Sequence, residues 1–280
     1  MKKRFNFRKS YFFTYLILTI FTIIMIFPFY WMIVTSLSKP ENLFRFPPKL
    51  WPDFNFHNYI EMWQSSPQGV SWVRYILNTL FVATTTTLLS LITSSLAGFA
   101  FGKLKFPLKD KIFMVILGVM MIPGELMLIP NYMTLFHLGW LNSYQALIIP
   151  FGASVFGIFL TRQAFKQLPN ELWEAAEIDG CSIGRFYLNI ALPIVRPTLF
   201  AFSLFVFLGS WNAFMWPLIV NTDPKFMPLE VALYSFIGSE STNWQLLAAA
   251  ATMATAPVLI LFLIFQTQFI EGISRGAIKG

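Results

Sequence analysis

The sequence has few charged residues. Only 12% of its 280 residues are Asp, Glu, Lys or Arg, whereas 56% are hydrophobic and 32 are Phe. Soluble domains carry about 25% charged residues, so this chain has too little polar surface to face water on all sides. The composition therefore excludes an ordinary soluble domain and indicates an integral membrane protein.

Residues that hold metals or form cross-links are also scarce. Cys181 is the single cysteine, so an intrachain disulfide cannot form. The only histidines are His57 and His137, and two histidines with one cysteine are too few for a plausible metal cluster. We therefore predict no metal site. The chain has no GxxxxGKS or GxxxxGKT phosphate loop. We expect no catalytic residue and no cofactor bound by this chain, and any nucleotide it depends on must bind to another chain.

The cations, in contrast, are numerous, with a net charge of +7. No basic surface with stacking aromatics stands apart from the apolar runs, so we expect no nucleic-acid partner. Lys and Arg instead set membrane topology. With the N-terminus inside, the inner segments hold fifteen of them and the outer segments five. This bias predicts that both termini are cytoplasmic.

Long uncharged runs predict six membrane-spanning helices, since about 20 apolar residues cross a bilayer. The run Leu126–Thr161 is too long for one span, and turn residues between Pro130 and Asn142 divide it. The predicted spans lie near 11–36, 76–101, 111–130, 144–163, 197–220 and 246–270. The first exceeds the h-region of a signal peptide and lacks a cleavage site, so we expect it to remain as a helix.

One polar segment, residues 169–197, interrupts the apolar sequence and is called the elbow below. Its acidic residues are Glu171, Glu174, Glu177 and Asp179. Asn170 predicts the N-cap of a first short helix and Gly180 its end, and Ser182 predicts the cap of a second. The apolar face of that second helix comprises Ile183, Phe186, Tyr187 and Ile190. We expect Pro193 and Pro197 to end it and to begin the fifth span.

Such a helix pair could lie on lipid, form a solvated loop or dock into a partner. The acidic side chains would repel an anionic membrane leaflet. A solvated loop seldom has such clear caps and such a regular apolar face. Docking into a groove of a cytoplasmic partner fits the elbow best.

At the elbow the chain resembles a known family. The run EAAEIDGCSIGRFYLNIALPIVRP is similar to the EAA signature of the membrane subunits of ATP-binding-cassette importers. The stretches IPGELMLIPNYMTLFHLGWLNSYQALIIP and WNAFMWPLI, and a tail ending GAIKG, are similar to the second permease of carbohydrate uptake systems of the maltose-transporter type. The resemblance covers nearly the whole chain. It departs at Cys181, where the family usually has Ala.

The resemblance implies an all-α integral membrane fold, with six transmembrane helices and a cytoplasmic coupling helix pair, as in a type I importer transmembrane domain. Residues 1–71 would hold the cytoplasmic N-terminus, the first helix and an extracellular segment, residues 72–271 the transmembrane domain with the elbow, and residues 272–280 a cytoplasmic tail. The implied ATPase-coupling residues are Glu174, Ala175, Ala176, Asp179, Gly180 and Phe186. The implied tail contacts to the ATPase are Gly276, Ala277, Lys279 and Gly280.

The resemblance also implies partners. These are a second homologous permease, two ATP-binding-cassette ATPase subunits, an extracellular or periplasmic solute-binding protein and membrane lipid. The location implied is a bacterial cell membrane, crossed several times. The outer segment Lys39–Arg74 suits docking of the binding protein, although its aromatics equally suit an interface belt.

Candidate residues for a solute path or gate are few. No charged residue lies deep in the predicted spans. Glu125, toward the outer end of the third, comes nearest to such a position, and it could contact solute or could cap backbone donors freed by prolines. Trp211, Asn212 and Trp216 could line the path, because neutral hydrogen-bonding groups beside aromatics suit sugars. Ordinary helix association is the alternative for such residues, as in the GxxxG pair Gly98 and Gly102.

The predicted function is a non-catalytic permease subunit of an ATP-driven, binding-protein-dependent importer for a sugar or oligosaccharide. It would form half of the translocation path. One alternative is an amino-acid or peptide permease of the same class. A self-contained carrier or channel is another, but it predicts an internal repeat that is not evident. A membrane enzyme would need a cluster of titratable residues, which the sequence lacks.

Overall fold

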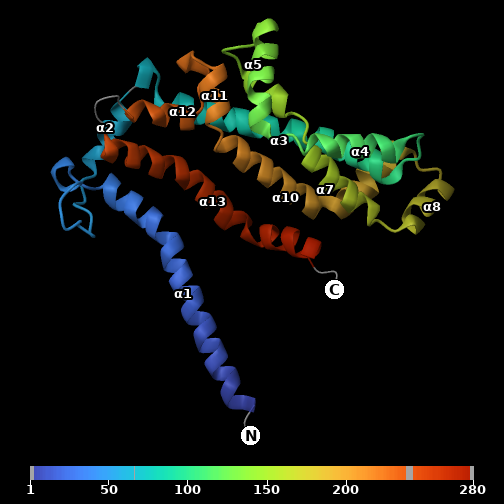
Figure 1. Ribbon diagram of the computed structural model, residues 1–280. Helices are drawn as coiled ribbons and strands as arrows, with labels where there is room; N and C mark the ends of the chain where they lie inside the picture. The colour runs from blue at the N-terminus through green and yellow to red at the C-terminus, as the bar shows by residue number, and fades with distance from the viewer. Residues whose placement is uncertain (1–2, 66, 238–241, 278–280) are drawn as a thin grey trace. The chain divides into compact units, whose positions relative to one another are not determined.

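The computed structural model describes residues 3–65, 67–237 and 242–277, with side chains for 11–65, 68–237 and 242–267. The described residues are almost entirely helical, with one isolated β-bridge between Ile237 and Thr242. The principal helices (Figure 1) are α1 (Lys3–Ser36), α2 (His57–Gln64), α3 (Trp72–Lys103), α4 (Lys109–Val119), α5 (Leu128–His137), α6 (Tyr144–Ile148), α7 (Val155–Lys166), α8 (Asn170–Ile178), α9 (Ile183–Phe186), α10 (Leu192–Trp211), α11 (Met215–Val220), α12 (Leu229–Leu233) and α13 (Trp244–Ala277).

Within the described part of the chain, four helical segments are long and apolar enough to cross a membrane, namely Tyr11–Ser36, Trp72–Lys103, Ile183–Trp211 and Trp244–Thr267. Two further segments are bent pairs. Lys109–Val119 meets Gly124–His137 at 88°, and Tyr144–Phe151 meets Val155–Lys166 at 42°. If each pair is one span, the total reaches the predicted six. The predicted all-α membrane class is therefore confirmed.

The third predicted span, 111–130, is not one continuous helix. Helix α4 ends at Val119, and residues 120–123, with Pro123 last, separate it from the next helical turn, Gly124–Met127. Pro130 was predicted to help interrupt the apolar run, but it lies within α5. It occupies the first turn of that helix, where a missing N–H is tolerated. The following turn uses Gly139 and Asn142, both left-handed, with φ of +67° and +56°.

The fifth span also has different bounds from the predicted 197–220. Helix α10 begins at Leu192 and ends at Trp211, and the separate short helix α11 follows. Pro217 explains the end of α10. In a continuous helix its ring would clash with the carbonyl of residue 213, and it has no N–H to donate. Pro197 lies inside α10 rather than before it.

The described chain forms two compact units, one of Met1–Ser66 with Leu233–Pro257 and one of Pro67–Ala232 with Val258–Gly280. In the first unit, Asp53 organises the segment after α1. Its carboxylate accepts from the backbone N–H of Lys39 at 2.9 Å and from the side chains of Asn42 and Lys49. These bonds, the Lys39 bond first, hold the pKa of Asp53 well below its usual value.

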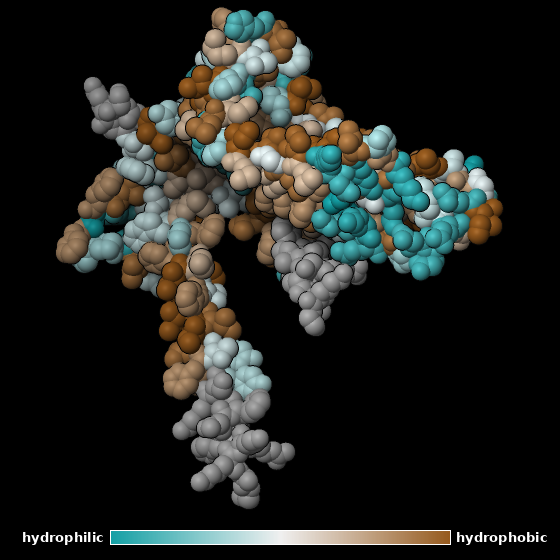
Figure 2. All heavy atoms as spheres, turned by 45° about the vertical axis from the view of Figure 1, so that its right-hand side comes forward, coloured by the Kyte–Doolittle hydropathy of each residue, from teal (hydrophilic) through white to brown (hydrophobic). Residues whose placement is uncertain are grey.

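Helix α1 belongs to the first unit and is apolar on all sides. Its side chains from Tyr11 to Phe29 are exposed in this chain, most of them Phe, Ile and Leu. Figure 2 shows this apolar surface along the described part of the helix. A helix that is hydrophobic all round is normally surrounded by lipid or by other apolar helices.

The second unit is built around α3, which packs along both α7 and α10. Gly98 and Gly102 permit the close approach to α7. A Cβ added at Gly98 would lie 2.0 Å from Thr161 Oγ1, and one at Gly102 would lie 2.9 Å from Phe165 Cβ. Small residues let helix backbones approach in this way. The helix-association interpretation of this GxxxG pair is therefore confirmed.

Candidate functional site

The first elbow helix, α8, starts differently from the prediction. Asn170 is its first residue rather than its N-cap, and its side chain makes no cap hydrogen bond. Lys103 at the end of α3 donates instead to Leu168 O at 2.7 Å and to Asn170 Oδ1 at 3.2 Å. This tertiary contact holds the Asn170 amide away from the helix terminus.

The turn between the two elbow helices follows the prediction. Gly180 has a φ of +69°, in the left-handed region that glycine adopts most easily. Its N–H donates to Glu177 O at 3.0 Å, and the next N–H, of Cys181, donates to Ala176 O at 2.8 Å. These two bonds form the Schellman motif that closes helix C-termini. Ser182 then caps α9 by accepting from Arg185 N at 3.4 Å.

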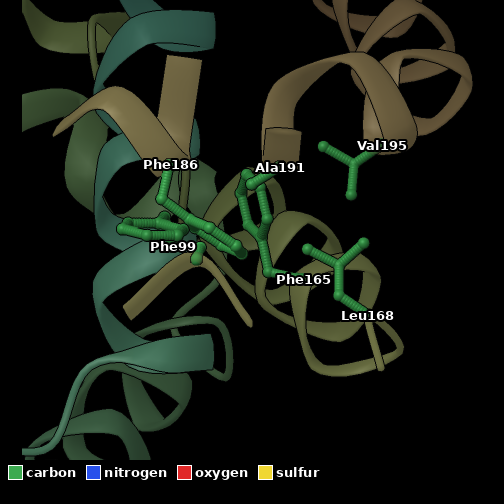
Figure 3. Packing of buried hydrophobic residues seen from close by; sticks show 7 residues of the cluster. Phe99, Phe165, Leu168, Phe186, Ala191 and Val195 are labelled. Atoms are coloured by element: carbon green, nitrogen blue, oxygen red, sulfur yellow. The ribbon is translucent and has the colours of Figure 1, made fainter. Parts of the chain in front are cut away.

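The inner face of the elbow is anchored in an aromatic cluster. Phe186 is 2% exposed and Ala176 is 7% exposed. The Trp173 ring meets the Phe186 ring edge-on, with centroids 4.7 Å apart. Figure 3 shows the labelled members of the cluster packed together, with Phe99 and Phe165 beside Phe186. The buried members of this elbow cluster are Phe99, Phe165, Leu168, Ala176, Phe186, Ala191 and Val195.

The outer face of the elbow is open. Glu174, Ala175, Asp179 and Gly180 are all exposed. Ile178, which sequence reasoning missed, is 87% exposed although it is a large apolar residue. Its position one turn after Glu174 and three residues after Ala175 would have identified it, because these spacings put all three on one helix face. The predicted coupling residues thus divide, with Ala176 and Phe186 inside and the other four outside.

The second elbow helix does not end at its prolines. The chain passes from α9 through a π-helical turn, Tyr187–Ala191, directly into α10. The Leu192 N–H donates to Tyr187 O, five residues back. This wider turn accommodates Pro193, which would otherwise clash with a carbonyl four residues before it. The second elbow helix and the fifth span are therefore one continuous helix, Ile183–Trp211, contrary to the prediction, whereas α8 is separated from it by the Gly180 turn.

Charged side chains surround the base of the elbow. Arg162 on α7 is buried, and its Nη2 lies 3.1 Å from Asp110 Oδ1 on α4. The same guanidinium donates to Phe101 O and lies 3.9 Å from the centroid of the Phe113 ring. Figure 2 shows hydrophilic side chains collected at this end of the unit, around the start of α4 and α8. Arg162 thus ties three helices together beside the elbow.

The predicted solute-path residues are not brought together. Glu125 is exposed at the 88° bend between α4 and α5. Trp211 is buried at the end of α10, with its ring stacked 5.7 Å from that of Phe207. Asn212 is exposed just beyond it. Of the four residues, Trp216 alone lines the pocket described next.

That pocket, called the helix pocket below, has a volume of about 280 Å³. Its walls come from α3, the α6–α7 connection, α10 and α11. The polar groups on its α3 wall are Thr79, Thr86 and Ser90, at spacings of seven and four residues. Such spacings put side chains on one helix face. The predicted path residues do not include Thr79, Thr86 and Ser90, and their spacing is the signal that could have identified them.

The predicted tail contacts fall at the limit of the described chain. Gly276 and Ala277 continue the backbone of α13, but their surroundings lie outside the described side chains. Lys279 and Gly280 lie outside the described residues altogether. Among the residues whose side chains are described, no three His, Cys, Asp or Glu residues are placed to hold a metal ion.

The helices and the elbow define a class: a multi-pass helical membrane protein whose fifth span continues into a polar, partly exposed helix pair. Residues 90–275 match the family described as binding-protein-dependent transport system inner membrane components. The match covers well over half of the chain, and the protein belongs to this family. It is accordingly a transport component rather than an enzyme.

Similar proteins share nearly the whole length. The Arabinooligosaccharides transport system permease protein AraQ of Bacillus subtilis is 31% identical over 262 residues, covering 92% of each chain. The Trehalose/maltose transport system permease protein MalG of Thermococcus litoralis is 33% identical, covering 92% of this chain and 93% of its own. A chain from the crystal structure of a bacterial ABC transporter involved in import of the acidic polysaccharide alginate has the same fold. The two chains have a TM-score of 0.83 and are 21% identical, and the alignment covers 94% of this chain and 97% of the other.

Proposed function

We propose that this chain is a permease subunit of an ATP-driven, binding-protein-dependent importer for a sugar or oligosaccharide. Family membership and the sugar-transport names of its relatives support this function. The chain forms half of the translocation path and takes no part in ATP hydrolysis. It binds no cofactor of its own.

The observation that carries this function is the two-sided elbow. One face holds Phe186 and Ala176 in the elbow cluster, while the opposite face presents Glu174, Ala175 and Ile178 to solvent. The exposed face suits a groove in a partner, with apolar anchors and an acidic side chain on one short helix. The docked helix α8 packs against Phe186 of α9 through Trp173 and Ala176, and α9 continues into α10, so a displacement of α8 is passed to a membrane span.

An importer of this class needs several partner proteins. Two ATP-binding-cassette ATPase subunits dock on the elbows of this chain and of a second homologous permease. An extracellular or periplasmic solute-binding protein delivers the solute at the opposite side of the membrane, and lipid surrounds the remaining apolar surface. The distribution of Lys and Arg supports a cytoplasmic elbow and cytoplasmic termini in a bacterial cell membrane. The tail residues Gly276, Ala277, Lys279 and Gly280 provide a second ATPase contact.

The transport cycle uses rigid-body motion. ATP brings the two ATPase subunits together, and their movement displaces the elbow. The spans then tilt between inward-facing and outward-facing arrangements, as in other hinge and shear transitions. Solute passes between the two permeases, and this chain contributes docking, transmission and part of the path.

Reversing the charge at the elbow tests this function. In a complex purified through a tag on this chain and reconstituted in liposomes, Glu174→Lys is expected to abolish solute-stimulated ATP hydrolysis while membrane assembly persists. Gly180→Asp adds a charge at the exposed turn and is expected to do the same. Gly180→Asn is its matched control, because Asn tolerates the left-handed conformation without adding charge, and it is expected to retain most coupling.

Two outcomes would overturn the proposal. Wild-type coupling in both charged variants would remove the elbow from the mechanism. Uptake by this chain without any nucleotide hydrolase would favour the self-contained carrier instead.

A further inference from the structure

The helix pocket lies in the second unit, and its volume of about 280 Å³ is near the lower end of ligand pockets. None of its lining residues is ionisable. Aromatic rings come from Phe151, Phe205 and Trp216, and hydroxyl groups come from α3 and α10. A pocket of this size and composition fits a small, uncharged ligand with both polar and apolar faces.

Two buried hydroxyl groups in the pocket have no hydrogen-bond partner in the described part of the chain. Thr86 is 2% exposed and Ser90 is fully buried, and neither side-chain oxygen has a hydrogen-bond partner among the residues that the structure describes. Their neighbour Thr87 is different, because its hydroxyl donates to Ala83 O at 2.7 Å. Buried hydroxyls are bonded in the great majority of cases. Thr86 and Ser90 therefore point to a ligand that supplies hydrogen-bonding groups.

The aromatic wall is held in place. Trp216 Nε1 donates to Ala146 O at 2.9 Å, which fixes the indole, and its ring meets that of Phe151 at 85° with centroids 6.1 Å apart. Fixed aromatic faces and neutral hydroxyls together match a sugar ring, which has C–H faces and hydroxyl edges. A lipid chain would leave Thr86 and Ser90 unpaired.

The neutral lining also discriminates among sugars. A carboxylate or phosphate placed in this pocket would lose its hydration without gaining a cation. An acidic polysaccharide, the substrate class of the structurally similar alginate importer, would therefore need cationic groups that this wall lacks. A neutral glycosyl unit incurs no such cost.

We propose that the helix pocket holds one neutral glycosyl unit of the solute during translocation, with Thr86 and Ser90 as hydrogen-bonding residues and Trp216 as the packing face. This inference rests on the proposed function and specifies its substrate class. It places a solute contact in this subunit itself and predicts discrimination against uronates and phosphorylated sugars.

Filling the pocket gives the main test. A Cβ added at Gly209, which lines the pocket from α10, meets no atom within 4 Å, so Gly209→Leu occupies the space without a clash at that atom. We expect at least a tenfold loss of uptake of radiolabelled maltose, lactose or arabinotriose by reconstituted complexes, with basal ATP hydrolysis retained. Gly118→Leu is the matched control, because Gly118 on α4 is equally unobstructed and lies outside the pocket.

Removing the hydroxyl groups gives a second test. Thr86→Val and Ser90→Ala are each expected to raise KM for the same neutral sugar about fivefold, the effect of one lost hydrogen bond, with little change in kcat. Thr87→Val is the control on the same helix. If the hydroxyl variants fail to assemble in the membrane, Gly209→Leu decides the question by itself.

The outcomes separate this inference from the proposed function. Absence of ATP-dependent uptake of any solute by the wild-type complex would refute the proposed function. Wild-type uptake that Gly209→Leu leaves unchanged would overturn the pocket assignment alone. Preferential uptake of a mannuronate trisaccharide or of a sugar phosphate over the neutral sugars would also overturn it.

Discussion

The two ends of one helix bundle have opposite interiors. At the elbow end, α3, α7 and α10 enclose rings with little space between them, such as Phe99 and Phe165, 5.4 Å apart. At the helix pocket, α3 and α10 enclose space and unpaired hydroxyls. On α3, Ser90 and Phe99 are nine residues apart, or about 14 Å along a helix. One bundle can thus be closely packed at one end and hollow at the other.

The difference follows from the side chains each helix presents. On α3, Gly98, Gly102 and Phe99 give close contact at the elbow end, and Thr86 and Ser90 face the pocket. Filled interiors resist deformation because every displacement costs contacts. A pocket requires the opposite, since a ligand must enter and leave. Three substitutions test the elbow end of this comparison.

The largest effect is expected at the buried centre of the elbow. Phe186→Ala removes a ring that is 2% exposed and touches Trp173 and Phe99, so it should destabilise the fold by about 3–5 kcal/mol. Solute-stimulated ATP hydrolysis should fall with it, because α8 loses its anchor. Thermal unfolding in detergent measures the first effect. Leu188→Ala, at a residue 60% exposed on the same segment, is the control, and equal melting of the two variants would contradict a packed elbow.

An intermediate effect is expected where α3 meets α7. Gly98→Ala places a methyl group 2.0 Å from Thr161 Oγ1, so the helices must separate. Overpacking of this kind costs about 1–3 kcal/mol. Gly118→Ala, where no atom lies within 4 Å, should leave stability unchanged or slightly raised. A melting temperature for Gly98→Ala equal to that of Gly118→Ala would show that the contact is not close in the protein.

The smallest effect on stability is expected on the exposed face of the elbow. Ile178 is 87% exposed, so Ile178→Ser should change the free energy of unfolding by no more than about 0.5 kcal/mol. Coupling should nevertheless fall severalfold, because an apolar anchor for the ATPase is lost. Paired melting and ATPase measurements separate the two. Unchanged coupling would mean that the partner does not contact this face.

Local chemistry made parts of the elbow predictable. Gly180 ends α8 because it has no side chain to oppose a left-handed conformation, and Ser182 caps α9 with its own hydroxyl. Both roles were identified from the sequence. Asn170 was misassigned because Lys103, 67 residues away in sequence, holds its amide. Capping preferences describe an isolated helix, whereas this helix starts against another element. The coupling and tail roles of the elbow and C-terminal residues stay predictions.

The spans show the same division. Their number and apolar character follow from hydropathy, because lipid requires long apolar helices. Their interruptions do not. The π-turn at Tyr187–Ala191 accommodates Pro193 in a continuous helix, whereas the chain breaks and bends by 88° between Val119 and Gly124, inside the third predicted span. Proline alone does not specify a break, since neighbouring packing decides whether a helix widens, bends or stops.

By itself, the sequence determined that this protein is helical, crosses a membrane several times and carries one polar elbow. These features depend on composition and on capping residues, which can be read from short stretches of consecutive residues. The tertiary structure alone decided which elbow face is buried, that α9 and α10 form one continuous helix, and that Thr86, Ser90 and Trp216 share a pocket. Those features depend on how distant helices pack. Packing joins side chains that are far apart along the chain, so no local pattern contains it.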